Sequence, residues 1–134
     1  MRVKDPRRTV EYVLKEHQEL PVEERPVFEI QDSMTAEQWE TVQAAANQRL
    51  YRGENGEVSV GMVEASIYIA AAVECTKGWR NLENEDGSPM AFDRMKIRDR
   101  LPHDWVAELG QRIAAGQEVE PDEAKNSSSP PEQD

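Results

Sequence analysis

The hydrophobic pattern near the N-terminus has the period of two that is typical of strands with one buried face. Val10, Tyr12 and Leu14 recur at this period in residues 9–14, and Phe28 and Ile30 do so in residues 26–30. We therefore expect a two-stranded ribbon there. The charged segment 15–25 contains Pro21, which favours an exposed connection over a continuation of either strand. A single helix over residues 7–19 is the alternative interpretation.

Two central segments instead have the three- and four-residue period of helices. Thr35 and Gln38 have the spacing of a capping box, so a helix should begin there and close near Gly53. Its predicted buried stripe consists of Trp39, Val42, Ala46 and Leu50. Residues 59–77 are apolar on nearly every side, and Gly78 is placed to cap them. We expect this second segment to be the central helix.

The C-terminal part of the chain is predicted to contain a loop, two further helices and a tail. An Asp-Gly pair gives residues 81–89 a strong turn signal. Asp93 can cap a short helix, and Pro102 can open another that ends near Gly116. Residues 117–134 are mostly Glu, Asp, Ser, Pro and Gln, and such a segment buries too little apolar area to offset its ordering entropy. We expect a disordered acidic tail.

These patterns predict a mainly α fold. The expected architecture is a compact bundle of four or five helices, with the N-terminal two-stranded β-ribbon as an optional addition. Residues 1–116 should form a single domain, because two cores within 134 residues would each be too small.

Composition narrows the classes of function. The net charge of −11 repels phosphate backbones, which argues against nucleic acid as a partner and favours a basic protein surface. No window approaches the ~20 apolar residues of a membrane span, and the first residues lack the apolar run of a secretory signal. The single Cys75 lies in an apolar run and fits a buried side chain in a reducing compartment. We expect a cytoplasmic protein without a membrane partner.

The sequence contains no arrangement typical of catalysis. Its two imidazoles, His17 and His103, have no partner at metal-ligand spacing. The glycines are too scattered for a phosphate-binding loop. Glu85 and Asp86 precede a glycine, but the alternating oxygen ligands of a calcium loop are missing. We therefore expect a protein that is not an enzyme and that uses no cofactor or metal.

One segment resembles a known family. Residues 77–93 read Lys-Gly-Trp-Arg-Asn-Leu-Glu-Asn-Glu-Asp-Gly-Ser-Pro-Met-Ala-Phe-Asp. This order of Gly-Trp, acidic Asp-Gly turn, Pro, aromatic residue and acidic helix cap resembles the tail assembly chaperones of long-tailed, siphovirus-type bacteriophages. Residues 11–15, 19–21 and 26–28, and residues 122–127, are also similar to that family.

The resemblance implies a role before the virion is complete. Such a chaperone binds the tape measure protein in the host cytoplasm and keeps it soluble while tail tube protein polymerises around it. It is then expected to be absent from the mature virion. The polar end of the chain resembles the short form of the family, which often has a longer form made by ribosomal frameshifting.

A chaperone of this kind needs an exposed apolar surface and enough charge to stay soluble when loaded. The candidate client contacts lie on the central helix and around the following loop: Met62, Ile69, Val73, Trp79 and Phe92. Each of them has an alternative role in core packing. Because the central helix is apolar on most sides, we also expect a homo-oligomer.

Two other functions fit a small acidic protein without catalytic residues. An inhibitor could present carboxylates in place of nucleic-acid phosphates to a host defence complex, although much of the negative charge lies in a connection and the tail. A structural head–tail or tail component would also lack catalytic residues, but it would persist in the virion.

Overall fold

The computed structural model describes residues 1–3, 5–51 and 60–116, without the side chains at 49–51 and 60–62. In these residues three strands, four α-helices and two 3₁₀ turns follow one another along the chain. The elements are β1 (Thr9–Tyr12), η1 (Lys15–His17), η2 (Val22–Glu24), β2 (Val27–Gln31), α1 (Ala36–Tyr51), α2 (Val60–Cys75), β3 (Thr76–Arg80), α3 (Arg94–Asp99) and α4 (His103–Ala115).

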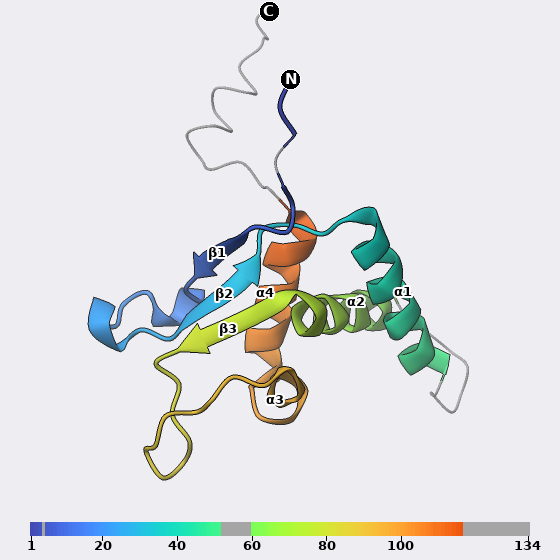
Figure 1. Cartoon of the computed structure of the whole chain (residues 1–134). Coiled ribbons are helices and arrows are strands. Elements are labelled where there is room, and N and C mark those ends of the chain that lie inside the picture. Colours follow the sequence, from blue (N-terminus) through green and yellow to red (C-terminus); the bar gives the residue numbers. More distant parts are fainter. Residues whose placement is uncertain (4, 52–59, 117–134) are drawn as a thin grey trace, which may run out of the picture.

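The strands form one antiparallel sheet in the order β1-β2-β3. In Figure 1, α4 crosses behind the sheet, β3 continues directly from the end of α2, and α1 packs on α2 on the side away from the strands. The short helix α3 lies below α2. The expectation of a mainly α bundle is therefore wrong, because the fold is mixed α/β with a sheet packed against helices.

The sheet accounts for the error. The predicted N-terminal ribbon is present, with Tyr12 opposite Phe28. The unpredicted strand is β3, whose first two residues, Thr76 and Lys77, the sequence placed at the end of the central helix. That helix ends at Cys75, and Gly78 pairs with Glu29 in the sheet and does not cap a helix. Trp79 lies opposite Phe28 in β2, so a distant aromatic partner draws these residues into a strand.

The core lies between the sheet and the helices. Phe28 and Ile30 of β2 and Leu14 are fully buried, and Leu109 and Ile113 of α4 belong to the same buried cluster. α2 contributes a run of small buried residues, which permits close packing of the helices. These residues are Ala70, Ala71, Ala72 and Cys75.

Several helix ends are where the sequence predicts them. The backbone N–H of Gln38 donates to Thr35 Oγ1 at 3.1 Å, and the backbone N–H of Thr35 donates to Gln38 Oε1 at 3.0 Å. The predicted capping box therefore forms. Asp93 Oδ1 accepts from the Met95 N–H at 2.9 Å and caps α3. Gly116, with φ of 70°, follows the last residue of α4. Gly53, the predicted end of the first helix, and the predicted tail 117–134 lie outside the described residues.

Candidate partner-binding surface

An open hollow of about 400 Å³ lies between the start of α1 and the end of α4. Its apolar lining comes from residues of both helices and of the segment before α1: Met34, Ala36, Trp39, Ile113 and Ala114. Trp39 is 37 % exposed, which is high for so large an apolar side chain. We call this site the Trp39 hollow.

The position of Trp39 corrects one sequence expectation. Val42 and Ala46 of the predicted stripe are buried, but Trp39 is not. Among the principal contacts of the described residues, α1 packs only on α2. The fourth member of the stripe, Leu50, has its side chain outside the described part of the chain.

The wall formed by α1 is fixed to the end of β2. Gln31, 1 % exposed, accepts a hydrogen bond at 3.0 Å from the side-chain amide of Gln38 and donates one at 2.9 Å to the Ser33 carbonyl. The capping box anchors the same turn of α1. Trp39 follows Gln38 directly, so its backbone is held in place before any partner arrives.

The opposite wall is fixed to the same strand end by an ion cluster around the buried Asp32. The Asp32 side chain, 4 % exposed, contacts Arg112 of α4 at 3.0 Å and Arg8 at 3.0 Å. Arg112 also donates to the Gly116 carbonyl at 2.9 Å. Burial raises the pKa of Asp32, but the hydrogen bonds and charges of Arg112 and Arg8 together outweigh it, so the net pKa lies below the usual range.

Two of the sequence-predicted contacts lie together. The Trp79 indole N–H donates to the Met90 carbonyl at 2.8 Å. The Trp79 ring packs edge-on against the rings of Phe92 and Phe28, with ring centroids 4.8 Å and 6.2 Å apart, respectively. Both Trp79 and Phe92 are half-buried against the core. Their visible role is to hold the loop between β3 and α3 against the sheet.

The other three predicted contacts lie on α2. Val73 and Ile69 are partly buried against the core, and the Val73 carbonyl accepts from the Arg94 side chain at 3.1 Å. Ile69 also lines a smaller hollow of about 150 Å³ between α2, α3 and α4. Met62 belongs to α2, but its side chain lies outside the described residues. The predicted residues that are described therefore do not form one continuous surface.

Comparisons with protein-family models, with curated protein sequences and with solved structures found no match. What this surface can bind must therefore be inferred from its own side chains. In the part of the chain that the structure describes, no three His, Cys, Asp or Glu side chains are grouped to hold a metal ion. Across the same residues, no helix combines the length and apolar character of a membrane span.

Sequence reasoning missed Met34 and Trp39 as surface residues. With Thr35 as the helix cap, Met34 is the residue before the cap and Trp39 is the fourth residue of the helix. Apolar residues at these two positions form a hydrophobic staple, which fixes the angle at which the chain enters the helix. The spacing is visible in the sequence and would have placed both side chains at the helix end, where both now line the Trp39 hollow.

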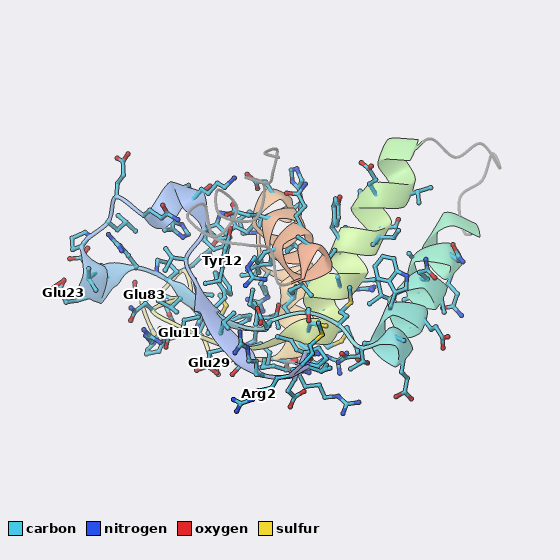
Figure 2. The ribbon with its side chains drawn as sticks, turned by 90° about the horizontal axis from the view of Figure 1, so that it is seen from above. Arg2, Glu11, Tyr12, Glu23, Glu29 and Glu83 are labelled. Atoms are coloured by element: carbon cyan, nitrogen blue, oxygen red, sulfur yellow. The ribbon has the colours of Figure 1, made fainter. Side chains whose placement is uncertain are left out.

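Acidic side chains cover the outer face of the sheet and its far end. Figure 2 shows Glu11, Glu29, Glu23 and Glu83 along this side of the molecule. Glu11 and Glu29 lie opposite each other in neighbouring strands. Arg80 contacts Glu11 at 2.9 Å, and its hydrogen bond holds the pKa of that carboxyl below the usual range. On the other face of β1, burial and then the Glu108 carboxylate, 2.7 Å away, raise the pKa of Tyr12.

Proposed function

We propose that this protein is a tail assembly chaperone of a long-tailed bacteriophage, which binds the tape measure protein and keeps it soluble while tail tube protein assembles. The observation that carries the proposal is the order of residues in 77–93, which resembles that family. In the fold, these residues form β3, the ordered loop and the cap of α3 as one unit.

The Trp39 hollow supports the binding part of this proposal. An open apolar depression with a half-exposed tryptophan provides area for apolar side chains of a client. Tryptophan is also among the residues that most often dominate binding energy at interfaces. The acids Glu37 and Glu40 lie exposed on the same first turns of α1 and would keep the loaded complex soluble.

Co-expression tests the proposal. The chain would be produced together with the tape measure protein of the same phage, and the soluble, co-purifying tape measure protein would be quantified. We expect the wild-type chain to keep the client in solution. Trp39→Ser should weaken binding by about 2 kcal/mol, or ~30-fold, as expected for an interface tryptophan. Trp39→Phe keeps an aromatic ring and should retain most of the binding.

The matched control is Val3→Ser, which removes an apolar side chain that is 88 % exposed elsewhere on the surface. It should leave the yield of soluble client unchanged. If the tape measure protein stays insoluble and unbound with the wild-type chain, the chaperone proposal is wrong. Mass spectrometry of purified virions separates a chaperone, absent from the particle, from a structural tail component that remains in it.

A further inference from the structure

The connection between β1 and β2 presents an unusual exposed surface. Val22 is 72 % exposed and Leu20 is 38 % exposed. Acidic residues flank them on both sides, and all three of these are exposed: Glu19, Glu23 and Glu24. We call residues 19–24 the acidic ridge. Contact between water and an apolar side chain at such an exposed position is unfavourable, and burial against another surface would remove it.

The acidic ridge is held in one conformation. Arg25 donates from its side chain to the Leu20 carbonyl at 2.8 Å and to the Gln18 carbonyl at 2.7 Å. Asn81, at the end of β3, donates to the Glu23 carbonyl at 3.1 Å and to the Arg25 carbonyl at 2.8 Å. The ridge therefore needs little ordering when it binds, which favours its use as a contact.

A surface of opposite character lies among the helices. The hollow of about 150 Å³ beside Ile69 has an apolar floor completed by Ile97, Leu101 and Val106. Arg98 and His103 also line it, and both are exposed. Arg98 has no acidic partner among the ion pairs of the described residues. We call this the Ile69 hollow; its volume suits one aliphatic side chain.

We propose that the acidic ridge of one copy of this chain docks into the Ile69 hollow of a second copy. Val22 enters the apolar floor, and Glu23 and Glu24 lie beside Arg98. The two surfaces match in apolar character and are opposite in charge, which favours this pairing over contact between like surfaces. In Figure 1 the connection between β1 and β2 projects away from α2 and α3, so a second copy, and not the same chain, supplies the ridge.

The proposal concerns the chain alone and does not depend on a client. Sedimentation velocity over a range of protein and salt concentrations would measure association. We expect the wild-type chain to associate, more weakly at high salt because the ion pairs are at the surface. Val22→Asp and Arg98→Glu should each weaken association by at least about tenfold. Val22→Ser and Arg98→Gln, which change charge less, should have smaller effects in the same direction.

Mixing the two stronger variants is the decisive experiment. The Val22→Asp chain keeps an intact hollow and the Arg98→Glu chain keeps an intact ridge, so an equimolar mixture should form mixed complexes that neither variant forms alone. Val3→Asp, at another exposed apolar residue, should associate like the wild type. A wild-type chain that stays monomeric up to high concentration would overturn the proposal. So would association that neither folded variant weakens, which would point to another surface.

Discussion

Gly110 of α4 lies directly against the backbone of Tyr68 in α2. A Cβ atom on Gly110 would lie 2.0 Å from the Tyr68 carbonyl oxygen and 2.5 Å from its carbonyl carbon. The two helices therefore meet backbone to backbone at this crossing. Leu109 and Ile113, on the same helix as Gly110, are fully buried. The missing side chain at Gly110 lets α4 approach α2 closely while it also packs against the sheet.

Gly110→Ala should be strongly destabilising. The added methyl group would overlap a backbone carbonyl, which cannot move aside as the end of a side chain can. We expect a loss of about 3 kcal/mol in the free energy of unfolding, at the upper end of overpacking costs, despite the preference of ~1 kcal/mol for Ala in helices. Urea unfolding measures the change. Gln111→Ala, at the exposed neighbour, is the control and should stay within about 0.5 kcal/mol.

Helix ends could be predicted from the sequence because their chemistry is local. Thr35 and Gln38 satisfy each other's backbone N–H groups, and Asp93 accepts from a residue two positions later. Both arrangements depend on spacing that the sequence shows directly. The alternation of β1 is likewise a local pattern, because Val10 and Tyr12 lie on its less exposed face, whereas in β2 only Glu29 is exposed.

The strand β3 could not be predicted in the same way. Thr76 and Lys77 continue a helical pattern, and Gly78 has the position of a helix cap in the sequence. What makes the segment a strand is its pairing with β2, especially that of Trp79 with Phe28. That partner is distant in sequence, so local propensity gives no sign of it. The candidate site differs from β3, because the Met34–Trp39 spacing is visible in the sequence, but the exposure of Trp39 depends on how the neighbouring elements pack around it.

The ion cluster around Asp32 should make stability fall in acid. Because the pKa of Asp32 is lower in the folded protein than its ordinary 3.8, its contribution is present above pH 3.8 and is lost as the pH falls through the folded value. Asp32→Asn should cost about 2 kcal/mol at pH 7, less than the ~3–5 kcal/mol of a fully buried pair, because Arg8 is half-exposed.

The measurement compares the unfolding free energies of wild type and Asp32→Asn at pH 7 and at pH 3. We expect the difference between the two proteins to shrink at the lower pH. The exposed Asp99 provides a control, because Asp99→Asn removes a carboxylate without touching the cluster. A difference that does not change with pH would show that Asp32 acts through packing alone.

Trp79→Phe should loosen the loop between β3 and α3. The substitution keeps an aromatic ring next to Phe92 but removes the N–H that donates to the Met90 carbonyl. We expect a loss of about 1–2 kcal/mol in stability, the cost of leaving such an acceptor without its donor. Hydrogen exchange should become faster at the Met90 amide, which donates to the Leu82 carbonyl across the loop. Trp39→Phe, away from the loop, should leave exchange at Met90 unchanged.

Cys75 should resist thiol reagents in the folded protein. Its side chain is fully buried, and burial, followed by the charge of Glu74, raises the pKa of the thiol to about 11 from the usual 9.0. At pH 8 the reactive thiolate is then about 100-fold scarcer than for a free cysteine, and the reagent also has no access to the sulfur. Labelling should therefore proceed only as fast as the protein opens.

The same pKa shift makes a prediction for alkaline conditions. A thiol whose pKa is raised by folding stabilises the folded state below pH 9.0, and this contribution is lost as the pH rises through about 11. Unfolding measured between pH 8 and pH 11 should show a steeper loss of stability in the wild type than in Cys75→Ala, which has no thiol to ionise. Rapid thiol labelling of the native protein would contradict the buried position of Cys75 at the junction of α2 and β3. The same conclusion would follow if the stabilities of the two proteins depended equally on pH.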